Sequence, residues 1–193
     1  GGNYNTVVGD EAGTAITTGD SNVALGTYAL FLNSTSSDNT AVGTSALSQN
    51  TAASNTGVGK AALTSNTSGA TNVAVGALAL DANTTASNNT AVGYASLGAN
   101  TTGANNTGVG RESLLVNTTG ASNTALGSTS LDANTTGSFN TAIGQASLTA
   151  STTASNNTAL GYQSLTANTT GVNNVAVGSL SLDASTTGNF NVG

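Results

Sequence analysis

The hydrophobic and polar positions of this chain recur in one fixed pattern. An aliphatic residue followed by Gly recurs every seventeen residues from Val8-Gly9 to Val177-Gly178, except in one repeat that is a single residue shorter. Counted from its Asn as position one, the unit reads Asn-[Thr/Val]-Ala-[Val/Leu/Ile]-Gly-x-x-[Ala/Ser]-Leu-x-Ala-Asn-Thr-Thr-[Gly/Ala]-x-x. About eleven units fill residues 1–193, so we expect a single repeat array without a second domain.

The unit predicts strands rather than helices. Such a unit is too short for two packed helices, and Thr, Asn and Gly are poor helix formers. Positions one to four alternate as in a short strand with positions two and four on one face, and the Ala/Ser-Leu pair at positions eight and nine is expected in a second short strand. The Gly between them and the Asn-Thr-Thr-Gly stretch are bend and turn signals. The pattern predicts an all-β parallel β-solenoid, or β-roll, of about eleven 17-residue coils.

Two apolar files are predicted to form the core of the solenoid. Position four is always Val, Leu or Ile, and position nine is Leu in every unit except the first, which has Gly13. Stacking of the coils would align each file along the axis, so we expect both files inside. The core residues predicted in this way are Val42, Leu47, Val75, Leu80, Val92, Leu97, Leu126, Leu131, Ile143, Leu148, Leu160 and Leu165.

The Asn at position one predicts a structural ladder. Stacked coils would place each Asn about 4.8 Å from the next, so that its amide could bond to its neighbour and to the turn backbone. The predicted ladder consists of Asn22, Asn39, Asn55, Asn72, Asn89, Asn106, Asn123, Asn140, Asn157 and Asn174.

Composition narrows the function classes. The chain has no His, Cys, Met, Trp or Pro, so it lacks the usual general base, the thiol nucleophile and the soft metal ligands. We therefore expect no enzyme activity, no cofactor and no metal. Lys60 and Arg111 are the only basic residues, too few to neutralise a run of phosphates, so nucleic acid is not an expected partner. No apolar stretch approaches the roughly 18 residues that span a bilayer, so membrane insertion is not expected.

Several residue sets could suggest binding sites. The aspartates at position ten would lie roughly 14 Å apart in a stacked rod, too far to share an ion. A weak cation site in the N-terminal acidic cluster and a carbohydrate platform of aromatic rings are alternatives. The position-ten aspartates are Asp81, Asp132 and Asp183; the acidic cluster is Asp10, Glu11 and Asp20; the aromatics are Tyr28, Phe31, Tyr94, Phe139, Tyr162 and Phe190.

The Asn-Thr-Thr turns raise two further possibilities, ice binding and glycosylation. Adjacent residues of a strand point to opposite faces, so a Thr pair would present one outward hydroxyl per coil rather than a two-column lattice. Turn formation explains both the pairs and the glycosylation sequons, which we interpret as structural. The pairs begin at Thr84, Thr101, Thr118, Thr135, Thr152, Thr169 and Thr186, and the sequon asparagines are Asn33, Asn66, Asn83, Asn100, Asn117, Asn134 and Asn168.

Small residues predict how chains assemble. Position eight is Ala or Ser in every unit, and position three is small in all but the first. Such files would let another chain approach closely, so we expect several chains side by side, with three favoured; the alternative is that small residues merely fit a narrow coil interior.

The motif Asn-Thr-Ala-Val-Gly-x-x-Ala/Ser-Leu, as in residues 89–97, resembles two repertoires. One is the head repeat of trimeric autotransporter adhesins, whose unit is shorter; the other is the repeat array of long bacteriophage tail fibres, notably those of cyanophages. The first resemblance implies a trimer of parallel β-rolls with an extracellular binding role, and the second a host-recognising or spacer segment of a fibre.

Taken together, these features predict a homotrimeric fibre shaft. We expect an extracellular, rigid segment of a virion tail fibre or cell-surface appendage that holds a tip for a host-surface glycan or receptor. The repeat runs through both ends of the chain, so we expect a piece of a longer fibre. The alternatives are a self-assembling extracellular filament and an ice-binding β-solenoid that uses Thr files.

Overall fold

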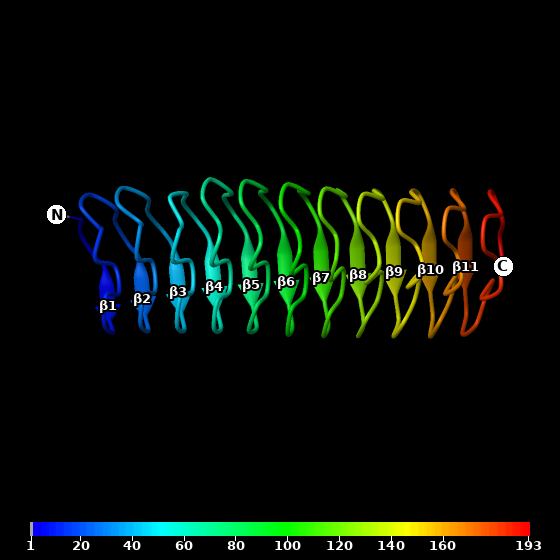
Figure 1. Ribbon diagram of the computed structural model, residues 1–193, viewed down its shortest axis with the longest axis horizontal. Helices are drawn as coiled ribbons and strands as arrows, with labels where there is room; N and C mark the ends of the chain where they lie inside the picture. The colour runs from blue at the N-terminus through cyan, green and yellow to red at the C-terminus, as the bar shows by residue number, and fades with distance from the viewer. Residues whose placement is uncertain (1) are drawn as a thin grey trace.

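The computed structural model describes residues 2–193 as a straight parallel β-solenoid, which confirms the predicted all-β class. The strands lie side by side along the rod and the termini lie at its two ends (Figure 1). Each of the eleven strands has three residues, at positions two to four of the unit. They are β1 (Thr6–Val8), β2 (Val23–Leu25), β3 (Thr40–Val42), β4 (Thr56–Val58), β5 (Val73–Val75), β6 (Thr90–Val92), β7 (Thr107–Val109), β8 (Thr124–Leu126), β9 (Thr141–Ile143), β10 (Thr158–Leu160) and β11 (Val175–Val177).

The strands form one sheet in chain order, and all neighbours pair in parallel. Equivalent positions face each other: Thr90 pairs with Thr107 and Val92 with Val109. The register is kept at the one shorter repeat, between β3 and β4, because Thr40 still pairs with Thr56. The missing residue is absorbed in the turn before Asn55, whose side-chain amide donates to Asn50 Oδ1 at 3.1 Å.

Positions six to eleven form a tight series of turns, and the expectation of a second strand there is wrong. The residues at positions seven and nine adopt left-handed backbone conformations, as in Ala95 (φ 50°) and Leu97 (φ 53°). A strand needs negative φ at every residue, so this backbone curls instead of extending. Its amides still bond to the neighbouring coils: Leu97 N donates to Ser113 O at 2.9 Å and Ala95 N to Ala77 O at 3.0 Å.

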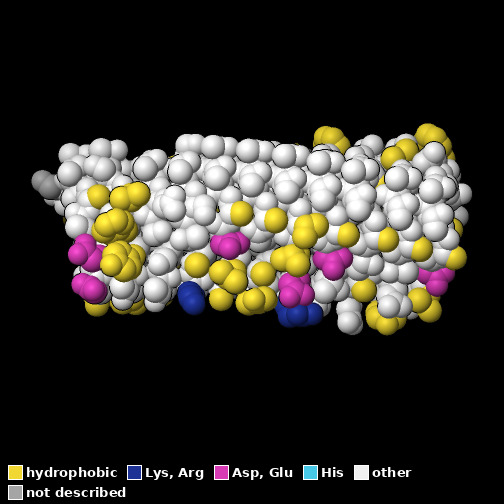
Figure 2. Space-filling view, viewed as in Figure 1, with side chains coloured by type: hydrophobic (Ala, Val, Ile, Leu, Met, Phe, Trp, Pro, Cys, Tyr) yellow, Lys and Arg dark blue, Asp and Glu magenta, His cyan; other side chains and the backbone are white. Residues whose placement is uncertain are grey.

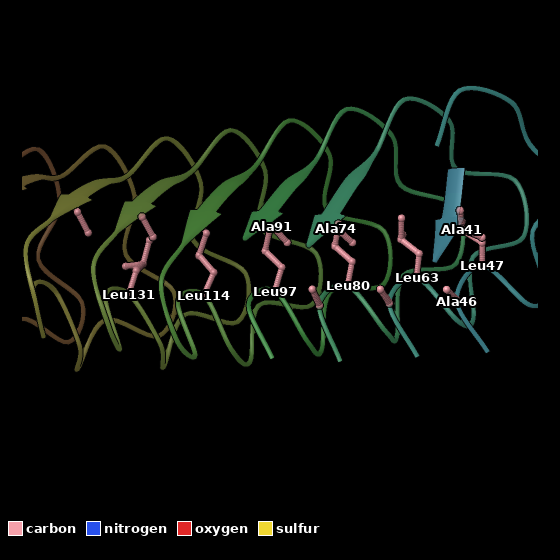
Figure 3. Packing of buried hydrophobic residues seen from close by; sticks show 14 of the residues in the cluster. Ala41, Ala46, Leu47, Leu63, Ala74, Leu80, Ala91, Leu97, Leu114 and Leu131 are labelled. Atoms are coloured by element: carbon pink, nitrogen blue, oxygen red, sulfur yellow. The ribbon is translucent and has the colours of Figure 1, made fainter. Parts of the chain in front are cut away.

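The core is a column of leucines against a column of alanines (Figure 3). The Leu at position nine has no exposed surface from Leu30 to Leu165, including the predicted core residues Leu47, Leu80 and Leu97. The Ala at position three is equally buried, as in Ala41 and Ala91. The remaining predicted leucines with no exposed surface are Leu131, Leu148 and Leu165.

The other predicted core file, position four, lies on the outside of the sheet. Val42 and Ile143 are half-buried, and the exposed fractions of the others are 37% for Val75, 36% for Val92, 45% for Leu126 and 43% for Leu160. Successive strand residues point to opposite faces, so burying position three turns positions two and four outward. The small residues of positions three and eight, which were expected to receive another chain, instead fill the narrow interior.

The Asn at position one forms a continuous ladder. From coil to coil, the backbone N–H of each Asn donates to Oδ1 of the preceding Asn, as in Asn106 to Asn89 and Asn123 to Asn106, both at 2.9 Å. The side-chain amide often reaches the carbonyl of the turn that follows fourteen residues later, as Asn106 Nδ2 does at Gly120 O (2.8 Å). The ladder positions with no exposed surface are Asn22, Asn39, Asn55, Asn72, Asn89, Asn106, Asn123, Asn140, Asn157 and Asn174.

A second Asn ladder follows position twelve without interruption from Asn50 to Asn134, and it ends where Ser151 replaces Asn. In the intact part, Asn117 Nδ2 donates to Asn100 Oδ1 at 2.8 Å and Asn134 Nδ2 donates to Asn117 Oδ1 at 2.7 Å. The next residue is Ser151, whose shorter side chain does not reach. Asn134 Oδ1 and Ser151 Oγ are therefore buried without a hydrogen-bond partner.

Replacing Ser151 with Asn should repair this ladder. The new amide would donate to Asn134 Oδ1, and its oxygen would accept from Asn168. Two restored hydrogen bonds should raise the free energy of unfolding by about 1 kcal/mol, measured by urea denaturation. The reverse change, Asn117→Ser, interrupts the ladder in a coil where it is intact, and it should lower the free energy of unfolding by about 1–3 kcal/mol. A Ser151→Asn protein no more stable than the parent would contradict this account of the ladder.

Candidate interaction surfaces

One face of the rod is the outer face of the sheet, which we call the outer sheet face and define as positions two and four of strands β1–β11. Position two is Thr or Val and position four is Val, Leu or Ile in every strand. Because the strands pair in register, these side chains form two parallel columns. The columns contain no charged residue, and many of their members are more than a third exposed, from Val8 (57%) to Val177 (57%). The position-four column is a continuous line of aliphatic side chains, and an exposed apolar strip is typical of a surface that meets a partner.

The paired threonines lie on another edge, and the first hydroxyl of most pairs already donates to a carbonyl of the next coil. Thr101 Oγ1 donates to Thr118 O and Thr118 Oγ1 to Thr135 O, both at 3.0 Å. At Thr85 and Thr102, the second Thr of the pair is exposed while the first is half-buried. This edge therefore presents one free Thr column rather than two.

The sequon asparagines lie inside the second ladder. All seven have no exposed surface, and Asn83, Asn100 and Asn117 each bond to a neighbouring Asn. A folded rod therefore hides the nitrogen that a glycan would modify, which agrees with a structural role for the Asn-Thr-Thr turns.

The positions whose residue type differs most from unit to unit lie on one flank. We call it the variable flank and define it as positions six, seven, ten and eleven. Eight of the ten charged residues occupy positions six, seven and ten of their units, and Asp20 and Asp38 are the exceptions. Charged and hydrophobic side chains lie together along this side of the rod (Figure 2). Arg111 Nη1 lies 2.9 Å from Glu112 Oε2, the one ion pair among residues 2–193.

The aspartates of position ten are partly enclosed on this flank. Desolvation raises the pKa of Asp81 above its ordinary value, against hydrogen bonds from its own backbone and from Ala82. Desolvation also raises the pKa of Asp132, with a smaller contribution from the negative charge of Glu112. No group of three or more acidic side chains within residues 2–193 is placed to hold a metal ion.

The N-terminal acidic cluster does not converge either. Glu11 accepts a hydrogen bond from the Thr14 hydroxyl at 3.0 Å, while Asp20 Oδ1 accepts one from the backbone N–H of Asn3 at 2.6 Å. The two carboxylates are therefore engaged by separate local partners.

The aromatic residues occupy four different positions of the unit and form no common platform. Tyr28 and Phe31 pack edge to face, with ring centroids 5.4 Å apart. Phe139 and Phe190 are 63% and 77% exposed at a turn away from the variable flank. Of the four rings on the variable flank, Tyr28 and Phe31 share one coil, whereas Tyr94 and Tyr162 lie four coils apart in sequence.

Sequence reasoning missed the outer sheet face, and it gave the variable positions six, seven and ten, which it expected to face solvent, no binding role. The outer sheet face was concealed by the assumption that the larger aliphatic residues point inward. The variable flank could have been found from the clustering of charged residues at three positions of the unit. Among residues 2–193, no helix has the length and apolarity needed to cross a membrane. No family model, curated protein or solved structure matches this chain.

Proposed function

We propose that this chain is a rigid shaft segment of an extracellular fibre, built from copies that pack side by side through the outer sheet face. The observation that carries the proposal is the uncharged double column of Thr/Val and Val/Leu/Ile side chains along β1–β11. The coils stack through backbone and Asn hydrogen bonds along the whole rod, so the shape suits a spacer that holds a tip at a distance. The resemblance to phage tail fibres and trimeric adhesins supports three copies and a tip that meets a host glycan or receptor.

A second copy fits the outer sheet face better than an unrelated protein does. Two identical rods have the same rise per coil, so their columns stay in step over all eleven strands. A partner without this repeat would match the columns at one or two coils only. Burial of the file from Val8 to Val177 would also remove the exposed aliphatic surface that a lone rod leaves in water.

The mass of the protein in solution tests the proposal. Light scattering after size exclusion should give three times the chain mass of 18.4 kDa. The double variant Val75→Lys with Val92→Lys places two charges on the outer sheet face and should give single chains. The matched control, Thr85→Lys with Thr102→Lys, places the same charges on the exposed Thr edge of the same coils and should remain trimeric. Single chains of the parent protein at all concentrations would refute side-by-side packing.

Ice binding is the second candidate, and the outer sheet face favours it more than the Thr pairs do. Position two is Thr in eight of the eleven strands, from Thr6 to Thr158, so the sheet offers a regular Thr column beside an aliphatic one. Thermal hysteresis by single chains would favour this candidate. Its absence, together with a trimeric mass, would favour the shaft.

A further inference from the structure

The variable flank has a hollow of 320 Å³ that spans three coils. Its floor contains Ala95 and Gly98, where the absence of a side chain at position ten opens space. Leu78 lies on the side of the preceding coil, and Leu115 and Val116 on the side of the following one. Figure 2 shows hydrophobic side chains around acidic ones in the middle of this flank.

The Asp81 carboxylate is the one ionisable group in the lining of this hollow. Its Oδ1 lies 3.4 Å from the point that a Cβ on Gly98 would occupy, so the carboxylate lies beside the floor of the hollow. No basic residue within residues 2–193 pairs with it, because the ion pair of the chain joins Arg111 to Glu112. Desolvation raises the pKa of Asp81 in spite of hydrogen bonds from its own backbone and from Ala82, and no ion pair within residues 2–193 offsets its charge.

Several backbone amides of the hollow are already bonded within the rod. Gly98 N donates to Ala95 O at 3.2 Å, and Ala99 N donates to Leu115 O at 2.9 Å. An anion would meet the negative charge of Asp81, and a polyol would find this one carboxylate among mostly apolar side chains. A cation on an aliphatic stem matches both features, because the carboxylate accepts its N–H groups and the leucines cover its carbons.

We propose that this hollow binds a primary alkylammonium group, with the ammonium against the Asp81 carboxylate and the aliphatic stem between Leu78 and Leu115. The shared chemistry is that of a lysine side chain and of a free aliphatic amine. The negative net charge of the chain, −6, favours the approach of such a ligand. The site lies outside the outer sheet face, so the proposal stands apart from side-by-side packing.

The repeat provides its own comparison, three coils further on. Asp132 occupies the same position as Asp81, but Thr149 replaces Gly98 and Thr129 replaces Leu78. Thr149 fills the space and its Oγ1 lies 3.0 Å from Thr166 Oγ1. The coil of Asp132 thus has a carboxylate equivalent to that of Asp81, but Thr149 occupies the space that Gly98 leaves open. Thr149 also shows that the fold accepts Thr at position ten.

Titration of the full-length chain with n-butylammonium, followed by amide NMR, tests the proposal. Saturable shifts are expected at Gly98, Ala99 and Leu115, with n-butanol and butyrate at least about fivefold weaker. Asp81→Asn should weaken n-butylammonium binding about fivefold. Gly98→Thr, which copies Thr149, should abolish the shifts; if it does not fold, Leu78→Thr takes its place.

The matched control is Asp132→Asn, which removes an equivalent charge and should leave binding unchanged. Equal weakening by Asp132→Asn and Asp81→Asn would reduce the effect to net charge and overturn the proposal, as would butyrate binding as strong as that of n-butylammonium. Nα-acetyl-lysine methylamide separates the two sources. If Nα-acetyl-lysine methylamide binds as tightly as n-butylammonium, the ligand is a lysine side chain. If only n-butylammonium binds, the ligand is a free aliphatic amine.

Discussion

Replacement of Gly93 by Ala should cause a large loss of stability for the addition of a single methyl group. Gly93 has φ +133°, a conformation that residues with a side chain rarely adopt, at a cost of about 1–3 kcal/mol. The new Cβ would also stand 2.5 Å from Gly110 O in the next coil, well inside van der Waals contact. Separation of the coils to relieve the clash would weaken several inter-coil hydrogen bonds, so we expect a total loss of about 3–5 kcal/mol.

A substitution at Gly178 separates the cost of the backbone conformation from the cost of the clash between coils. Gly178 has nearly the same backbone conformation, φ +129°, but a Cβ placed there meets nothing closer than Ser181 Cβ at 3.9 Å. Gly178→Ala should therefore show the conformational cost alone, about 1–3 kcal/mol. Urea denaturation followed by circular dichroism measures both variants under the same conditions. Equal losses in the two would show that the stacked glycine column imposes no steric limit on coil spacing.

Much of the fold follows from the period of the sequence. A unit of this length with Asn at position one and Leu at position nine allows few structures besides a stacked coil, and both files are buried as that arrangement requires. The one-residue gap before Asn55 could be assigned to a turn because the strand motif on either side is intact. These features are visible in sequence because each repeats at almost every coil.

The direction of the strand side chains could not be read from the sequence. Thr-Ala-Val alternates whichever face is inside, and hydrophobicity alone favours burial of the larger Val. The decisive factor is space: Leu97 already fills the interior opposite the sheet, so only Ala or Gly fits at position three. At Gly57, for instance, an added Cβ would stand 3.1 Å from Leu47 Cγ. This limit depends on the distance between two walls of a coil, which no local pattern reports.

The hollow at Gly98 was missed for a different reason. Position ten varies from Phe31 to Asp81 to Gly98, and such variation usually marks solvent-facing residues without a role. Only the stacked coils bring Asp81, Gly98 and Leu115 side by side, since each is a full period away from the next in sequence. A comparison of residues one period apart, rather than of neighbours in the sequence, would have placed the Asp81 carboxylate beside the space left by Gly98.

Truncation of Leu97 to Ala should have the second large effect. Leu97 has no exposed surface and lies in the middle of the leucine column, with Leu80 and Leu114 in the coils on either side (Figure 3). The interior is closed by hydrogen-bonded coils on both sides, so it cannot collapse onto the cavity. Loss of a fully buried leucine in such a site should lower the free energy of unfolding by about 2–5 kcal/mol.

The same substitution at Leu32 provides the control. Leu32 is 47% exposed at position eleven, so its truncation leaves no closed cavity and should cost under about 1 kcal/mol. Each coil touches only its neighbours, so the weakening at Leu97 should stay local. Hydrogen exchange should then show faster exchange of the amides of the coils that contain Leu80, Leu97 and Leu114, with little change near Leu30 or Leu165. Uniform acceleration along the rod would mean that the solenoid unfolds as one cooperative unit.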